Sequence, residues 1–192
     1  MRAFHLRVSF LSNTCAASQQ LDIWLVEAGT YVGPLNRMDM KGKMVTFVAA
    51  SGPGTVTVDC NGTGFAVMMV STETIETVID GFIFTNCHGD DVFGSSLNPP
   101  LPLGSGGAVV FAGAARGLIR NCVIRLNSAA VAGGGVLVYT TNVAAGTGPT
   151  LTNTTLERNS AMFGAAVSVS AGTLTLNDCR FQVLPLIVTT LV

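Results

Sequence analysis

The sequence predicts an all-β protein built as a parallel β-solenoid, and three observations support this. Segments of nine residues recur with the same order of apolar and Asp/Asn positions. Within them apolar residues alternate with a period of two, which is typical of strands. Val, Ile and Thr, which favour strands, are abundant, and the sequence shows no amphipathic stretch of helix length. With 192 residues, the chain has room for one domain, or at most two small ones.

The repeat appears four times without internal gaps. The copies are Val78–Asn86, Ile119–Asn127, Leu151–Asn159 and Leu176–Leu184, at intervals of 41, 32 and 25 residues. The third position is always Asp or Asn, namely Asp80, Asn121, Asn153 and Asp178. The sixth position is always apolar, namely Ile83, Ile124, Leu156 and Phe181. The ninth position is Asn in the first three copies only.

A solenoid explains why these positions recur. One strand-turn-strand unit cannot bury its own apolar side chains, whereas coils stacked about 4.8 Å apart pair each strand with its equivalents above and below. We therefore expect the sixth positions to form one stack inside the core. We expect the third positions to lie at one corner of successive coils, where their side chains form a ladder and hydrogen-bond to backbone groups.

A second block lies between these segments. Gly106–Phe111 matches Gly134–Tyr139 and, more loosely, Ala165–Ser170, so each unit has a glycine turn followed by another strand. The first interval is the longest because it contains Asp90–Gly104, whose Pro, Gly and Ser content predicts a loop. Stacked repeats tolerate such insertions, so we expect the loop to leave the strand register unchanged.

The repeats place a single parallel β-helix domain at residues 16–182, flanked by segments of uncertain structure at 1–15 and 183–192. The N-terminus is basic and contains small residues that resemble a cleavage site, but His5 and Arg7 interrupt its apolar part. It is therefore not a convincing signal peptide. The pattern fails at Leu184 and no capping segment is evident, which predicts that the chain is a fragment of a longer protein.

Composition excludes several classes of protein. The 10 Lys+Arg and 11 Asp+Glu residues do not make a polycationic binder of nucleic acid, and the 48% apolar content excludes a disordered chain. Glycine and proline interrupt every long uncharged stretch, so no transmembrane segment is predicted. The five cysteines form no CxxC pair and their number is odd, so at least one thiol is free. Buried free thiols are the default expectation for all of them.

The repeats resemble the right-handed parallel β-helix of the pectin-lyase-like superfamily. More narrowly, they are similar to the GGA[ILV] and FxxN repeats of chlamydial-type polymorphic outer membrane proteins. The first motif appears as Gly106–Val109, and the second as Ile83–Asn86, Ile124–Asn127 and Leu156–Asn159, with Ile or Leu in place of Phe. The segment Leu21–Gly33 resembles the first coil of such helices. The resemblance implies the fold and leaves the function open, because one fold hosts many functions.

The superfamily contains polysaccharide lyases and hydrolases, so the resemblance makes acidic clusters candidates for catalysis. Asp90 and Asp91 follow His88 in the predicted loop. Paired carboxylates act as acid and base in glycoside hydrolysis, and adjacent Asp side chains also bind Ca²⁺. A solvated loop explains the three residues more simply. Arg125 and Glu157, at the seventh position, are expected to be stacked neighbours that form a surface ion pair.

Two N-glycosylation patterns occur, at Asn61 and Asn153. Asn61 lies in a predicted surface turn, whereas Asn153 belongs to the expected corner ladder and should not be accessible. The preferred function is a non-catalytic extracellular or cell-surface module for adhesion, scaffolding or glycan binding, with polysaccharide or surface glycan as its partner and no cofactor. The alternative is a polysaccharide lyase or glycoside hydrolase of the pectin-lyase type. The sequence leaves the oligomeric state open.

Overall fold

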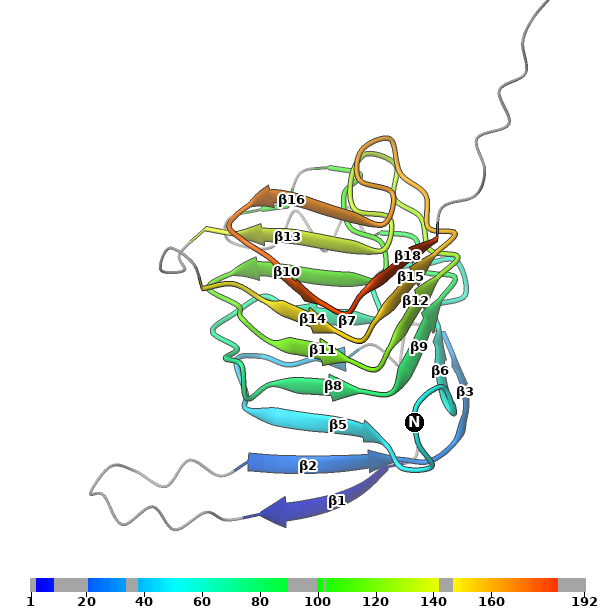
Figure 1. Ribbon diagram of the computed structural model, residues 1–192, viewed down its shortest axis with the longest axis vertical. Helices are drawn as coiled ribbons and strands as arrows, with labels where there is room; N and C mark the ends of the chain where they lie inside the picture. The colour runs from blue at the N-terminus through cyan, green and yellow to red at the C-terminus, as the bar shows by residue number, and fades with distance from the viewer. Residues whose placement is uncertain are drawn as a thin grey trace, which may run out of the picture.

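The computed structural model describes residues 3–8, 21–33, 38–89, 100–101, 103–141 and 147–182. In these ranges the chain is all-β, without a helix, and winds through about five turns. Three sheets run along the stack, and each turn contributes one strand to each sheet (Figure 1). The predicted all-β parallel solenoid is therefore confirmed. The described part of the chain contains no helix of the length and apolarity that a membrane crossing requires.

The first sheet contains β1 (Ala3–Val8), β2 (Leu21–Val26), β5 (Val45–Ala49), β8 (Val78–Asp80), β11 (Leu118–Arg120), β14 (Thr150–Thr152) and β17 (Thr175–Asn177). The second contains β3 (Gly29–Val32), β6 (Val56–Asp59), β9 (Phe82–Thr85), β12 (Val123–Arg125), β15 (Thr155–Glu157) and β18 (Arg180–Gln182). The third contains β4 (Met38–Asp39), β7 (Val67–Met69), β10 (Val109–Gly113), β13 (Val136–Thr140) and β16 (Val167–Ala171). Among the strands of the described residues, only β1 pairs antiparallel, at the edge of the first sheet next to β2.

The core forms because inward positions of successive coils carry apolar side chains. In the second sheet, Val58 pairs with Phe84, Phe84 with Ile124, and Ile124 with Leu156. All four are buried. Their sequence neighbours point outward and are half-buried, as the period of two requires.

The expected core stack is wrong in one member. Ile83 pairs with Val123 and faces outward, whereas Phe84 occupies the column of Ile124, Leu156 and Phe181. The first interval of the repeat is therefore 40 residues, as the contact between Asp80 and Arg120 also shows. The gap-free alignment matched Asp80 to Asn121 by chemistry and shifted that copy by one residue. Phe181 keeps its place in the column but is 45% exposed.

The corner between the first two sheets explains this shift. Its residue takes a left-handed conformation in each coil, with φ of +54° at Asn121, +46° at Asn153 and +52° at Asp178. Asn and Asp tolerate this conformation better than other side chains. In the coil before them the corner residue is Gly81, with φ of +88°. A Cβ atom there would lie 3.1 Å from the Cβ atom of Ala49 and 3.2 Å from the backbone of Pro53, so a side chain at this corner would be crowded.

The glycine motif marks a second place where backbones approach closely. A Cβ atom on Gly107 would lie 1.6 Å from the carbonyl oxygen of Gly134 in the next coil. Gly107 also donates its amide to the carbonyl of Gly133, at 2.8 Å. The motif therefore sets the distance between coils at this corner, and its recurrence follows from that contact.

The long insertion preserves register, as expected. β8 pairs with β11 and β9 with β12 without interruption on either side of it. Of the insertion itself, residues 90–99 and 102 lie outside the described part. Leu101 is buried against the outer face of the third sheet, in a cluster with Phe65, Met68, Val110 and Leu137. The end of the insertion therefore packs against the third sheet at Leu101, a contact that the composition of the loop did not indicate.

Candidate functional site

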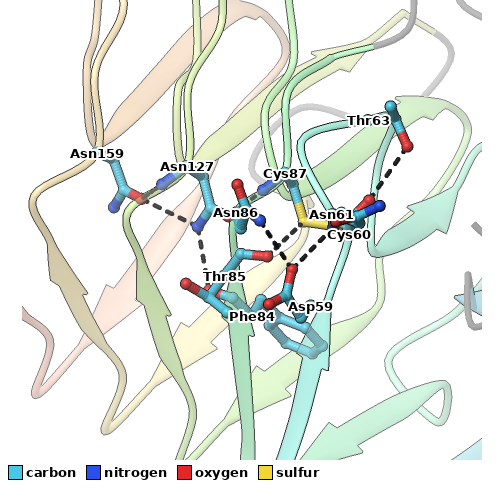
Figure 2. The surroundings of a disulfide bond; sticks show 10 residues. All are labelled: Asp59, Cys60, Asn61, Thr63, Phe84, Thr85, Asn86, Cys87, Asn127 and Asn159. Atoms are coloured by element: carbon cyan, nitrogen blue, oxygen red, sulfur yellow. Dashed lines mark hydrogen bonds between the residues drawn. A yellow bond between two sulfur atoms is a disulfide. The ribbon is translucent and has the colours of Figure 1, made fainter. Parts of the chain in front are cut away.

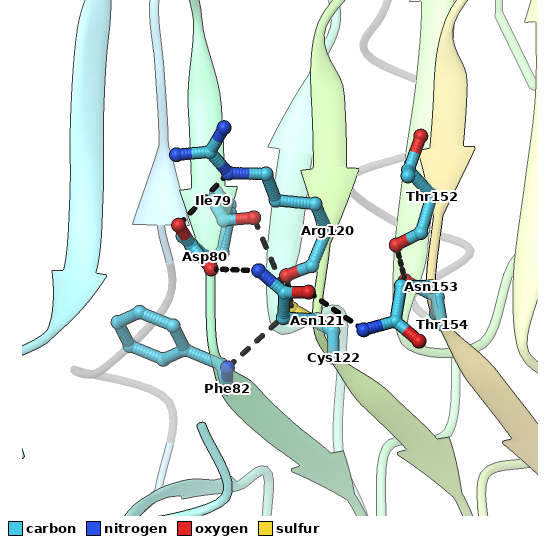
Figure 3. Close-up of polar contacts among 9 residues, drawn as sticks. All are labelled: Ile79, Asp80, Phe82, Arg120, Asn121, Cys122, Thr152, Asn153 and Thr154. Atoms are coloured by element: carbon cyan, nitrogen blue, oxygen red, sulfur yellow. Dashed lines mark hydrogen bonds and ion pairs between the residues drawn. The ribbon is translucent and has the colours of Figure 1, made fainter. Parts of the chain in front are cut away.

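The corner between the first and second sheets carries a ladder of polar side chains (Figure 3). Asn153 donates from Nδ2 to Oδ1 of Asn121 at 2.8 Å, and Asn121 donates to Oδ1 of Asp80 at 2.7 Å. The predicted ladder thus joins three of its four residues by side-chain contacts, although Asp80 reaches it from one position before the corner. Asp178 occupies the fourth corner position and is exposed.

The expectation that this ladder satisfies backbone groups is wrong. The amide of Asn121 donates to the carbonyl of Thr152, and that of Asn153 to the carbonyl of Asn177. Asn153 is exposed and not buried as expected, because the corner projects from the stack. Backbone pairing between coils already satisfies these amides, so the side chains pair with one another instead.

Charged side chains lie beside this ladder and at the far end of the strands of the second sheet. Arg120 donates from Nε to Asp80 at 2.8 Å, and Arg125 lies 3.8 Å from Glu157, as expected for stacked neighbours. The outward row that precedes the corner pairs in register along the stack. We call this surface the corner belt; it comprises Asp80, Arg120, Asn121, Thr152, Asn153, Asn177 and Asp178.

A second ladder is buried, and sequence reasoning did not select it. Asn127 accepts at Oδ1 from the amide of Cys87 at 3.0 Å and donates to the carbonyl of Phe84 at 3.1 Å. Asn127 also donates to Oδ1 of Asn159 (Figure 2). Asn159 donates in turn from Nδ2 to the carbonyl of Ile124 at 2.8 Å. The signal was present, since Asn recurs at the ninth position of the repeat. Asn127 and Asn159 therefore make the hydrogen bonds to backbone groups that we expected from the third position of the repeat.

Cys60 and Cys87 form a disulfide between neighbouring coils, with Cα atoms 4.7 Å apart (Figure 2). The default expectation of free thiols is therefore wrong for this pair. The register explains the contact, because Asp59 pairs with Thr85 and brings the residues that follow side by side. Cys122 is a free buried thiol and Cys179 a free half-buried one. Cys15 lies outside the described residues.

His88 is exposed at the corner that follows β9, and its Nδ1 lies 2.7 Å from Oγ of Ser128 in the next coil. It lines a small cavity of about 80 Å³ with Gly89, Gly104 and Ala130. The other two catalytic candidates, Asp90 and Asp91, lie outside the described residues. The structure therefore gives no geometry for the three as a group.

No set of three or more His, Cys, Asp or Glu side chains among the described residues is placed to hold a metal ion. The calcium expectation rested on Asp90 and Asp91, which lie outside the described residues.

Asn61 is exposed in a turn with φ of +55°, next to the disulfide. Its amide donates to Asp59, and Thr63 of the glycosylation pattern donates to the carbonyl of Cys60 at 3.1 Å. The surface turn expected there is present. Comparison of the chain with protein-family models, with curated proteins and with solved structures finds no match.

Proposed function

We propose that this chain is a non-catalytic extracellular or cell-surface β-helix module that binds glycans, in adhesion or as a scaffold. The motifs that resemble pectin-lyase-like helices, and more narrowly the polymorphic outer membrane protein repeats, support this proposal together with the solenoid fold. The corner belt is the observation that carries it.

The corner belt suits a polymeric ligand because it repeats its polar groups at each coil. Asp80 pairs with Arg120, Arg120 with Thr152, and Thr152 with Asn177, so donors and acceptors follow one another at the strand spacing of about 4.8 Å. A chain of sugar units lying along the solenoid axis would meet a new set of hydrogen-bonding groups at each coil. Many weak contacts of this kind add up through multivalency.

The disulfide supports the location. Disulfides persist in oxidising compartments and are rare in the reducing cytosol. Cys60 and Cys87 are both buried, and their bond joins two coils of the core. Mass spectrometry of the protein from its native source under non-reducing conditions tests this point. A free Cys60 thiol in that material would contradict the proposed location.

Retention of the full chain on immobilised polysaccharides, neutral and acidic, tests the binding function. We expect Arg120→Gln to reduce retention, because Arg120 is exposed in the middle of the corner belt. Arg158→Gln is the matched control, since Arg158 is exposed at a different corner. Equal effects of the two changes, or no retention of the parent, would contradict the proposal. Release of shortened or unsaturated products, with or without Ca²⁺, would favour the lyase or hydrolase alternative instead.

A further inference from the structure

We propose that a pocket at the first coil of the solenoid binds a single neutral sugar ring, which packs against Trp24 and Phe47 and hydrogen-bonds to Asp39 and Lys43. This inference rests on the proposed glycan-binding function. It adds a second site, separate from the corner belt, with a defined position and ligand class.

The fold builds the aromatic wall of this pocket from two neighbouring strands. β2 pairs with β5 so that Trp24 lies opposite Phe47. Their rings stack with centroids 6.3 Å apart and an interplanar angle of 20°. Both side chains are half-buried and pack against the main core, which fixes the wall in place.

The polar side of the pocket comes from β4 and the turn that leads into β5. Asp39 and Lys43 are exposed and line the pocket, and Asp22 joins them from β2. The Asp39 carboxylate accepts a hydrogen bond from the amide of Lys41 at 3.2 Å, which holds it while leaving further acceptor capacity. Buried Met40 completes the turn side of the lining.

The volume of the pocket indicates the size of the ligand that it accepts. The pocket has a volume of about 200 Å³. A cavity of about 150 Å³ accepts benzene, and sites for drug-sized molecules start at about 300 Å³. The pocket therefore matches one six-membered ring with its substituents and does not match an oligosaccharide.

The chemical groups that line the pocket favour a sugar as the ligand. One face of a pyranose ring presents C–H groups, which suit the electron-rich face of an aromatic side chain. Its hydroxyl groups suit carboxylate acceptors and an ammonium donor, and hydrogen bonds to charged groups are the stronger ones. The lining has two carboxylates and one ammonium, so it disfavours a uronic acid or a phosphorylated sugar.

Trp24 makes the test direct, because it is the single tryptophan of the chain and its fluorescence reports on the pocket. The full chain is titrated with the methyl glycosides of glucose, galactose and mannose, with glucuronate, and with tetramethylammonium. We expect a saturable change in Trp24 emission with at least one neutral glycoside. Glucuronate should bind more weakly than the corresponding glucoside.

Variants connect the signal to the site. Asp39→Asn should weaken binding by about tenfold, the effect of one hydrogen bond to a charged group. Lys43→Gln should weaken it as well, whereas Lys41→Gln, which removes the same charge from the same turn outside the lining, should not. Each variant is checked for unchanged thermal unfolding, so that a loss of binding is not a loss of fold.

Other outcomes of these titrations would contradict the proposed sugar site. A response to tetramethylammonium alone would identify a cation site formed by the aromatic wall and the carboxylates. No response to any probe, or equal effects of Lys41→Gln and Lys43→Gln, would remove the pocket as a sugar site. If in that case the chain is still retained on polysaccharides, and its retention depends on Arg120, the pocket is contradicted as a sugar site but the proposed function is not. Loss of both signals would contradict both proposals.

Discussion

Two asparagine ladders of the same chemistry differ in burial, and burial decides what each contributes to stability. Asn127 is 1% exposed and its side chain satisfies backbone groups of the neighbouring coil. Asn153 is exposed and its side-chain bond is to another side chain. A buried polar group that loses its partner costs about 1–3 kcal/mol, whereas an exposed substitution shifts stability by about 0.5 kcal/mol or less.

We therefore predict that Asn127→Ala lowers the free energy of unfolding by about 1–3 kcal/mol, since it strands the amide of Cys87 and the carbonyl of Phe84. Asn153→Gly, the matched control, keeps a residue that adopts the left-handed conformation freely and should change it by less than about 0.5 kcal/mol. Urea denaturation of both variants with the disulfide intact measures the two values. Equal effects would show that the two ladders do not differ in this way.

The buried thiol of Cys122 gives a second prediction at this scale. Burial raises its pKa from 9.0 to about 12, and hydrogen bonds from and to neighbouring backbone groups offset this only in part. Because the folded-state pKa is raised, the protonated thiol stabilises the fold below pH 9, and this contribution is lost as the pH rises towards 12. The thiolate is the reactive form, so native Cys122 should also resist alkylation.

Stability measured from pH 8 to 11 tests this prediction, with Cys122→Ala as the control that lacks the thiol. The parent should lose more stability than the variant across that range. Peptide mapping after alkylation should show Cys179 modified before Cys122, because Cys179 is half-buried. Early alkylation of Cys122 in the folded chain would refute the argument.

At the scale of the elements, the sequence was sufficient to predict strand pairing where the same residue type recurs at the same structural position. The strands of the last three repeat copies pair as aligned, because Ile119, Leu151 and Leu176 repeat in the same inward column. The copy that begins at Val78 was misplaced because its corner residue is Gly81 and not Asn or Asp, at a place where a Cβ atom would crowd Ala49 and the backbone of Pro53. Such a contact between distant segments is invisible in a pattern.

Two features of the candidate sites were not predicted from the sequence for the same reason, because both depend on contacts between coils. The Cys60–Cys87 bond depends on the register between β9 and β6, which lies outside the four repeat copies, and cysteine spacing alone does not reveal it. The first-coil pocket brings Trp24 and Phe47 together through pairing of β2 with β5, outside the four repeat copies. The local sequence pattern predicts which residues face inward, but predicting contacts between coils requires the register of every coil.

The long insertion supplies the prediction at this scale. Leu101 is 5% exposed and packs on the third sheet, whereas Leu103, two residues later, is 70% exposed. Leu101→Ala should lower the free energy of unfolding by about 2–4 kcal/mol, the cost of removing a buried leucine side chain. Leu103→Ala should leave it within about 0.5 kcal/mol. Thermal and urea unfolding of the two variants provide the comparison, and equal stability would place Leu101 outside the packed structure.

At the scale of the whole molecule, stability should vary along the stack. In a solenoid each coil contacts only its neighbours, so an inner coil has two interfaces and an outer coil one. β13 and β14 bury their inward side chains, whereas Val169, Leu176 and Phe181 of β16, β17 and β18 are 42–47% exposed. Inward side chains are therefore packed less tightly at β16–β18 than at β13 and β14. Strands β16–β18 form the end of the stack away from β1 and β2 (Figure 1).

Leu156 and Phe181 are neighbours in one column and test this gradient directly. Leu156→Ala should cost about 2–5 kcal/mol, because the residue is fully buried between two coils. Phe181→Ala should cost less although it removes a larger side chain, since its site is already 45% exposed. In native-state hydrogen exchange, amides of β17 and β18 should exchange before those of β11 and β12, and Leu156→Ala should accelerate exchange in the coils on both sides of it. Uniform protection along the stack, or a larger loss from Phe181→Ala than from Leu156→Ala, would contradict the gradient, because both would require the last coil to be packed as tightly as the inner ones.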